Sequence, residues 1–282
     1  MVKIRLPSSI SEVIREKVPD ADLKLMKLDT SSLESVRQFA AEFLDQENRL
    51  DILILNAGIR APLERTITDD GLELTMATNH YGHFLLTMLL LDLIIRSQPS
   101  RIVVVSSTGH LLSKIDLQDT TYENKGHYKS FLVYCDSKLA NVLFAKALAK
   151  KLSGTGTKLP CSAKPSNNKV THSTTIFLLL GVTTYALHPG AVRTEIMRDA
   201  KGVWTLLACA FRCCVCIKNP KEGAQTTIHC AVDEKLAHES GKYYQDCKPA
   251  RVNKLAKNEK LVHDFYQHSL EVTKAHDPMV LK

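Results

Sequence analysis

Short apolar runs that alternate with helical segments constrain this chain more than any other feature. The runs cover residues 51–55, 102–105 and 182–187, and they end in Asn56-Ala57-Gly58, Ser106-Ser107 and His188-Pro189-Gly190. Continuous apolar runs of this length are typical of strands buried on both faces of a parallel sheet. Between and after them, helices are expected at residues 33–46, 71–96, 131–152 and 220–235. The alternation predicts an α/β fold with a doubly wound parallel sheet covered by helices on both faces.

Two further elements are predicted near the start of the chain. Residues 8–18 are expected to form a short helix, and residues 22–29 (DLKLMKLD) alternate apolar and polar side chains as a strand does. A length of 282 residues suits one large α/β domain, and we interpret residues 1–282 as a single domain. Ligands of open parallel sheets bind beyond the carboxyl ends of the strands. We therefore expect Asn56, Ser107 and Pro189 to lie along one crevice.

Composition and charge exclude several other classes of protein. Hydrophobic residues make up 44% of the chain and charged residues 24%, as in ordinary globular proteins. The net charge of +7 comes from scattered basic residues, and only 6% of residues are aromatic, so no nucleic-acid partner is expected. The start of the chain lacks the apolar core of a signal peptide, and no apolar run reaches the roughly 18–20 residues that span a bilayer. These features predict a cytoplasmic protein.

The eight cysteines are expected to be thiols of a reducing compartment. Four of them cluster in residues 209–216, but their spacing is not the paired spacing of a zinc site. We interpret this cluster as part of an apolar segment, with lipidation or metal binding as the alternatives. No metal is predicted.

Tyr134 and Lys138 form the pattern Y-C-D-S-K on a predicted helix, and their spacing of four places them on one helical face. A nearby ammonium stabilises a phenolate and so makes tyrosine a better acid–base catalyst near neutral pH. Taken alone this pair is common and more often structural. Likewise, Ser107 alone could cap the following turn, Asn79 could be an ordinary polar helix residue, and Asp29 could neighbour a helix cap.

Taken together, the motifs resemble the short-chain dehydrogenase/reductase family and its retinol-dehydrogenase-like branch. The pieces that carry the resemblance are N-A-G at 56–58, N-x-x-G-H-F from Asn79, S-S at 106–107, Y-C-x-S-K-L-A-N from Tyr134, G-T-G at 154–156 and H-P-G-x-V-R-T-E from His188. The resemblance covers residues 20–156 and 181–275. It implies a Rossmann-like fold and an NAD(P)-dependent oxidoreductase.

The resemblance also implies a role for each residue of these motifs. Tyr134 would be the general acid/base, Lys138 would lower its pKa and hold the nicotinamide ribose, and Ser107 would hydrogen-bond the reacting oxygen of the substrate. Asn79 would hold a proton-relay water. The cofactor would further contact Asp29, Asn56, Ala57, Gly58, Pro189, Gly190 and Thr194.

Partners follow from the same resemblance. The substrate would be a small apolar alcohol or its aldehyde or ketone, of the retinol and retinal kind. The cofactor would be NADP(H) in preference to NAD(H). Family members commonly form a homodimer through the helices equivalent to residues 71–96 and 131–152. Contact with the membrane of the endoplasmic reticulum is also implied.

One departure from the family pattern concerns the cofactor. The chain has no T-G-x-x-x-G-x-G motif among its 12 glycines, and we expect the first two strands of the family sheet to be missing. The expected consequences are weak cofactor binding and an open hydrophobic edge on the 51–55 strand, with a risk of aggregation. The alternative to an active enzyme is a catalytically impaired fragment that acts by binding a partner.

A second departure is an insertion at residues 157–181. Its polar, Pro- and Asn-rich part predicts a loop, and its end, T-I-F-L-L-L, suggests a retained intron; a genuine long loop is the alternative. After Thr194, the apolar and Cys-rich residues 195–217 are predicted to form a lid over the substrate.

Overall fold

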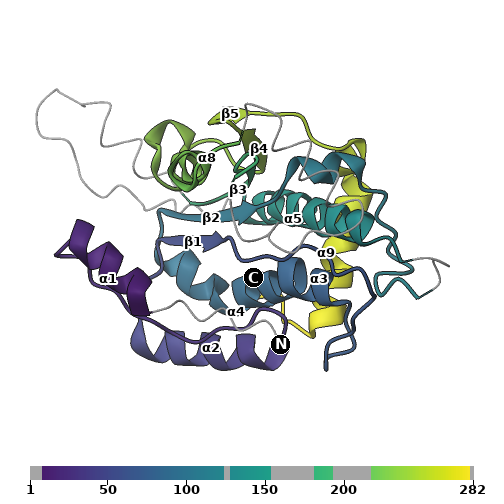
Figure 1. Cartoon of the computed structure of the whole chain (residues 1–282), viewed down its shortest axis with the longest axis horizontal. Helices are drawn as coiled ribbons and strands as arrows, with labels where there is room; N and C mark the ends of the chain where they lie inside the picture. Colours follow the sequence, from purple (N-terminus) through teal and green to yellow (C-terminus); the bar gives the residue numbers. More distant parts are fainter. Residues whose placement is uncertain (1–7, 124–127, 154–180, 193–216, 280–282) are drawn as a thin grey trace, which may run out of the picture.

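The computed structural model describes residues 8–123, 128–153, 181–192 and 217–279. At its centre lies a sheet in the order β1-β2-β3-β4-β5 (Figure 1). Its strands are β1 (Ile52–Leu55), β2 (Ser100–Val105), β3 (Val182–His188), β4 (Lys242–Gln245) and β5 (Lys248–Pro249). The first four are parallel, and β5 is antiparallel to β4. The three strands predicted from apolar runs are therefore confirmed, whereas β4 and β5 were not predicted.

Helices cover both faces of this sheet, as a doubly wound fold requires. One layer contains α2 (Leu33–Gln46), α4 (Gly82–Arg96), α5 (Ser130–Leu152) and α9 (Glu259–Thr273), and α8 (Pro220–Val232) packs on the other face (Figure 1). The short α1 (Ser8–Lys17) precedes them. The Rossmann-like α/β prediction is confirmed, and the predicted helices agree with the structure to within a few residues.

The predicted helix at 71–96 is not uniform. It begins with α3 (Leu74–Met76), continues through a five-residue π-helical turn, η1 (Ala77–Tyr81), and becomes regular only in α4. A π turn inserts one extra residue per turn and therefore re-aims the side chains around it. Here it carries Asn79, one of the predicted site residues.

The predicted strand at 22–29 is wrong. These residues are extended in part but pair with no strand of the described chain. A strand needs a neighbour for its backbone hydrogen bonds, and this segment instead ends in local contacts with the start of α2. The Asp29 amide donates to Ser35 Oγ at 3.0 Å, and Leu25 stays 60% exposed.

The C-terminal helix α9, which was not predicted, packs across α4 and α5. Its Phe265 and Tyr266 are fully buried, and the Tyr266 ring lies 5.3 Å from that of Phe84 on α4. Phe84 in turn lies 5.0 Å from Phe144 on α5. The homodimer was expected to use α4 and α5. The packing of α9 buries part of the surface of both helices, and the homodimer stays a prediction.

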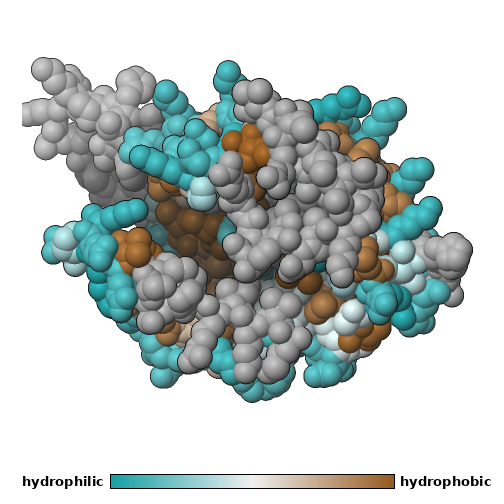
Figure 2. All heavy atoms as spheres, viewed as in Figure 1, coloured by the Kyte–Doolittle hydropathy of each residue, from teal (hydrophilic) through white to brown (hydrophobic). Residues whose placement is uncertain are grey.

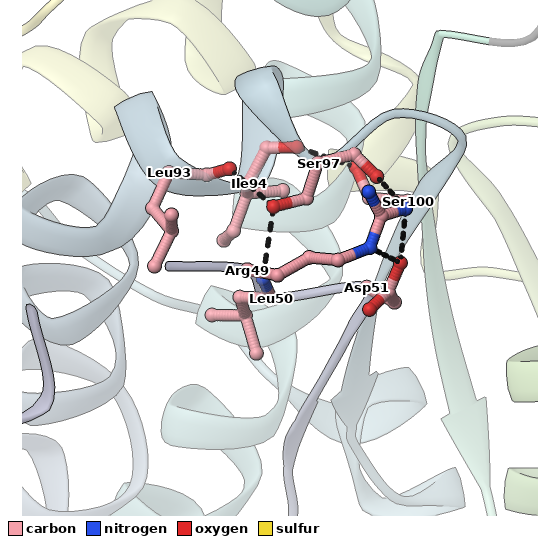
Figure 3. A network of polar contacts seen from close by, with 7 residues as sticks. All are labelled: Arg49, Leu50, Asp51, Leu93, Ile94, Ser97 and Ser100. Atoms are coloured by element: carbon pink, nitrogen blue, oxygen red, sulfur yellow. Dashed lines mark hydrogen bonds and ion pairs between the residues drawn. The ribbon is translucent and has the colours of Figure 1, made fainter. Parts of the chain in front are cut away.

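A polar network fixes the beginning of β1 against the end of α4 (Figure 3). The Arg49 guanidinium donates to Asp51 Oδ1 at 2.7 and 2.9 Å and to the Ser97 carbonyl at 3.1 Å. The Leu50 amide donates to Ser97 Oγ at 2.8 Å, and that hydroxyl donates to the Leu93 carbonyl at 2.7 Å. These bonds satisfy carbonyls at the C-terminus of α4 and hold β1 in register with β2.

β1 forms one edge of the sheet, as expected. The Arg101 amide donates to the Asp51 carbonyl at 2.8 Å. Alternation along a parallel ladder then turns the backbone groups of Ile52 and Ile54 toward the open edge. The side chains of Ile52 and Ile54 are 38% and 44% exposed. Figure 2 shows a brown, apolar hollow on this side of the molecule, over β1 and β2.

Exposed apolar strand edges promote association between chains, so Ile54→Lys should reduce aggregation of the purified protein. Because Ile54 is 44% exposed, the free energy of unfolding should change by only about 0.5 kcal/mol. Light scattering against protein concentration, together with urea unfolding, measures both effects. Leu55→Lys is the matched control, since Leu55 is 2% exposed in the same strand and its replacement should unfold the chain. Unchanged aggregation of Ile54→Lys would contradict the prediction.

Most of the insertion at 157–181, nearly all of the lid at 195–217 and the whole of Thr194 lie outside the described residues. Among the described helices, none combines the length and the apolar character needed to cross a membrane.

Candidate active site

Ser107, Tyr134 and Lys138 meet at the carboxyl end of β2. Ser107 is the second residue after β2 and caps a 3-10 turn, where its Oγ accepts from the Gly109 amide at 3.2 Å. Tyr134 and Lys138 lie one turn apart on α5, with the Lys138 ammonium 5.6 Å from the centre of the Tyr134 ring. A side-chain hydrogen bond joins Ser107 to Tyr134. Ser107 therefore both caps a turn and contacts Tyr134, so its interpretation as a turn cap is compatible with its interpretation as a site residue.

The pKa values of this group differ from the expectation. Burial raises the pKa of Tyr134, and the hydrogen bond with Ser107 only partly opposes this effect. Burial lowers the pKa of Lys138 to about 8. The structure therefore keeps Tyr134 protonated at neutral pH, opposite in direction to the expected lowering by Lys138. A protonated hydroxyl is suited to donate a proton to a developing alkoxide.

Asn79 ties the loop after β1 to α5. Its Nδ2 donates to the Ile59 carbonyl at 2.9 Å and to Ser137 Oγ at 3.0 Å, and its Oδ1 accepts from the Ile59 amide at 2.7 Å. The residue is completely buried, and the π turn η1 directs its side chain across to α5. Asn79 therefore joins the group next to Tyr134, and its relay role stays a prediction.

Gly58 provides close access to the Lys138 ammonium. A Cβ atom at this position would lie 3.1 Å from Asn79 Oδ1 and 3.3 Å from Lys138 Nζ. Glycine therefore lets the loop backbone lie directly beside the ammonium and the Asn79 amide. Ala57 is half-buried in the same loop and Asn56 is exposed, and their contacts with a cofactor stay predictions.

Pro189 and Gly190 follow β3 on the same side of the sheet. Gly190 has a φ of +98°, and a Cβ there would lie 2.7 Å from Lys218 Cδ. Lys218 donates to the Pro189 carbonyl at 3.4 Å and forms an ion pair with Asp246. The sequence reading missed Lys218, because no motif marks it and only its backbone pairing with the segment after β3, where its amide donates to the Ala191 carbonyl at 2.8 Å, brings it to the site.

His188 also lies at this end of β3. Burial lowers its pKa to about 4, so the ring is neutral, and its Nδ1 has no hydrogen-bond partner among the described residues. The H-P-G motif contains this residue, so the sequence could have pointed to it.

Asp29 does not join the group. Its carboxylate accepts from the Ser31 amide at 2.9 Å and from the Ser31 hydroxyl at 2.6 Å. The cap residue of α2 itself is Ser32, so these bonds form the turn just before it and support the interpretation of Asp29 as a neighbour of a helix cap. Its approach to an adenine stays a prediction.

The described residues fit one end of a nicotinamide dinucleotide. The buried Lys138 ammonium beside Gly58 can bind ribose hydroxyls, and Gly190 lets the Lys218 side chain lie close to the backbone at the end of β3. For the pyrophosphate, the described residues offer no glycine-rich turn between a strand and a helix, the arrangement that usually supplies backbone donors. The fit therefore concerns the nicotinamide end alone. Across the described ranges, no three His, Cys, Asp or Glu side chains are grouped so as to hold a metal ion.

Comparison with solved structures supports the same fold. An uncharacterized protein from Mycobacterium paratuberculosis is similar over 96% of this chain and 83% of its own, with a TM-score of 0.66 and 26% identity. The NADPH-bound carbonyl reductase from chicken fatty liver has a TM-score of 0.54 at 18% identity, covering 88% of this chain and 84% of its own, and shows likeness of fold alone.

Sequence comparison identifies the family. The short chain dehydrogenase family model matches residues 5–118. Human retinol dehydrogenase 12 is 40% identical over 266 residues, which cover 94% of this chain and 74% of the relative. Human retinol dehydrogenase 13 is 36% identical, covering 95% of this chain and 73% of its own length. The chain belongs to the short-chain dehydrogenase/reductase family of oxidoreductases and to its retinol-dehydrogenase-like branch.

Proposed function

We propose that this chain interconverts an apolar alcohol and its aldehyde or ketone with NADP(H) in preference to NAD(H), and that retinol and retinal represent the substrate class. The observation that carries the proposal is the meeting of Ser107, Tyr134 and Lys138 at the carboxyl end of β2. Relatives named retinol dehydrogenases support the substrate class.

In the direction of reduction, Tyr134 donates its hydroxyl proton to the carbonyl oxygen while Ser107 holds that oxygen by a hydrogen bond. The bound dinucleotide supplies the hydride. The Lys138 ammonium stabilises the tyrosinate that the proton transfer leaves behind, and a low-dielectric surrounding strengthens this attraction. In oxidation the same groups work in reverse, with Tyr134 accepting the proton of the alcohol.

Two measurements on the purified 282-residue chain test the proposal. Binding of NADPH and NADH is measured by fluorescence titration, and turnover is measured with retinal or retinol. We expect turnover, and we expect NADPH to bind more tightly than NADH. Binding of both nucleotides should be weak, because no glycine-rich motif is present. A folded chain that binds neither nucleotide and turns over neither substrate would contradict the proposal that this chain is an active enzyme.

The open edge of β1 favours a second candidate function, the binding of a partner protein. With Ile52 and Ile54 exposed at an unpaired edge, the chain could act by binding a partner protein instead of by catalysis. A chain that binds no dinucleotide but gives a defined complex with a partner, lost on Ile54→Lys, would support this second candidate. The cytoplasmic location at the endoplasmic reticulum membrane stays a prediction.

A further inference from the structure

A continuous chain of buried side chains runs from α9 to the carbonyl on which Lys138 depends. Ser269 Oγ on α9 lies 3.0 Å from His80 Nε2, and His80 Nδ1 lies 3.3 Å from Asn141 Oδ1 on α5. Asn141 Nδ2 donates to the Val105 carbonyl at 3.1 Å. Ser269, His80 and Asn141 are completely buried.

The Val105 carbonyl joins this chain to the candidate active site. Lys138 Nζ donates to the same oxygen at 3.4 Å, and within the described residues this is the hydrogen bond of the buried ammonium. The next residue along β2, Ser106, donates to the Lys138 carbonyl at 2.6 Å. The orientation of the Val105–Ser106 peptide therefore influences the position of the Lys138 ammonium. It also influences the position of Ser107, the next residue along the chain.

The donors and acceptors around Asn141 determine the orientation of its side-chain amide. If its oxygen faced Val105, two acceptors would lie 3.1 Å apart with no proton between them, at a cost of about 1–3 kcal/mol. The amide nitrogen therefore faces Val105, and the oxygen faces His80. This arrangement requires a proton on His80 Nδ1, which leaves Nε2 as an acceptor. The Ser269 hydroxyl lies 3.0 Å from Nε2 and 2.8 Å from the Phe265 carbonyl, and its single proton serves one of these two acceptors at a time.

His80 is not itself an acid–base catalyst. Burial lowers its pKa to about 3, so the ring is neutral at working pH. The rings of Phe84, Phe144 and Phe265 lie within 5.9 Å of it and separate it from solvent. A neutral histidine with both ring nitrogens bonded inside an apolar cluster acts through geometry.

We propose that His80 and Asn141 are positioning residues for the Tyr134–Lys138 pair: His80, in its Nδ1–H form and packed against α9, orients the Asn141 amide, which fixes the Val105 carbonyl beside the Lys138 ammonium. Only the kinetic consequence of this inference rests on the proposed function. It also makes the docking of α9 a condition for an ordered active site.

The kinetic test compares His80→Leu with His80→Asn. Leucine removes both ring nitrogens, whereas asparagine places an amide donor where Nδ1 was. We expect kcat to fall about 10- to 100-fold in His80→Leu, with little change in the KM for NADPH, and to recover largely in His80→Asn. His268→Leu is the matched control, because His268 also joins α9 to η1, through Tyr81 at 3.2 Å, but has no link to β2. Equal losses of kcat in His80→Leu and His268→Leu would overturn the inference.

Nuclear magnetic resonance tests the same network without turnover. Ring-nitrogen spectra should show His80 as the Nδ1–H tautomer in the wild type and as the Nε2–H tautomer in Asn141→Leu, where Nδ1 has lost its acceptor. The Lys138 Nζ signal should shift in Asn141→Leu and not in His268→Leu. A wild-type Nε2–H tautomer, or an unmoved Lys138 signal, would overturn the inference even if the chain has no activity. Loss of turnover in the wild type with the expected spectra would refute the proposed function alone.

Discussion

Tyr134→Phe is expected to lower retinal reduction about 10²- to 10⁴-fold, the usual contribution of a positioned general acid. The substitution removes one oxygen atom and with it the proton that the carbonyl must receive. Binding of NADPH should change little, because the Lys138 ammonium and the space beside Gly58 stay in place. Single-turnover kinetics separate the two effects, since the hydride-transfer step should slow while the binding isotherm stays the same.

Tyr185→Phe is the matched control for this prediction. Tyr185 on β3 donates its hydroxyl proton to the Leu236 carbonyl at 2.6 Å, within a separate core cluster on the α8 side of the sheet. Losing this bond should cost about 1 kcal/mol of stability and leave the chemical step unchanged. If Tyr134→Phe kept the wild-type rate of reduction, or if Tyr185→Phe lost as much, Tyr134 would not be the proton donor.

Gly82→Ala is expected to destabilise the fold by about 1–3 kcal/mol or more, although alanine favours a helix. Gly82 begins α4 where the chain after residues 22–29 crosses it. A Cβ there would lie 2.0 Å from the Thr30 carbonyl oxygen and 2.9 Å from its carbon, so backbone would have to move. The midpoint of urea unfolding measures the loss.

Gly71→Ala provides the comparison for this steric effect. Gly71 has a φ of +75°, and nothing lies within 4 Å of a Cβ placed there. That variant should therefore lose only the conformational strain of about 1–2 kcal/mol. A Gly82→Ala chain at least as stable as Gly71→Ala would show that the contact between α4 and Thr30 relaxes freely.

The sequence reading was most accurate where local pattern and tertiary role coincide. The strands β2 and β3 are buried on both faces over most of their length, so a short apolar run describes them well. The same pattern located β1, although Ile52 and Ile54 are exposed at its open edge. The helix carrying Tyr134 and Lys138 was also predicted, to within one residue of its observed limits. By contrast, α9 has a clear apolar face, and Asn258 caps it, so a search for caps would have found it.

The errors in the sequence reading have a common cause. Residues 22–29 have the alternation of a strand, but alternation cannot supply a partner strand, and the described chain provides none. For Tyr134, the spacing to Lys138 could not indicate that burial raises its pKa, because burial comes from segments far apart in the chain. Its role as general acid/base stays a prediction.

The sequence alone determined the family and the fold class and predicted the candidate catalytic residues, because each depends on residue types at fixed spacings along one strand or helix. Only the tertiary structure showed that Lys138 donates to the Val105 carbonyl, that α9 packs against α4 and α5, and that Asn141 bonds the same carbonyl and lies within hydrogen-bond distance of His80. These are contacts between segments far apart in the chain. The packing of α4, α5 and α9 creates them, and no local pattern encodes them.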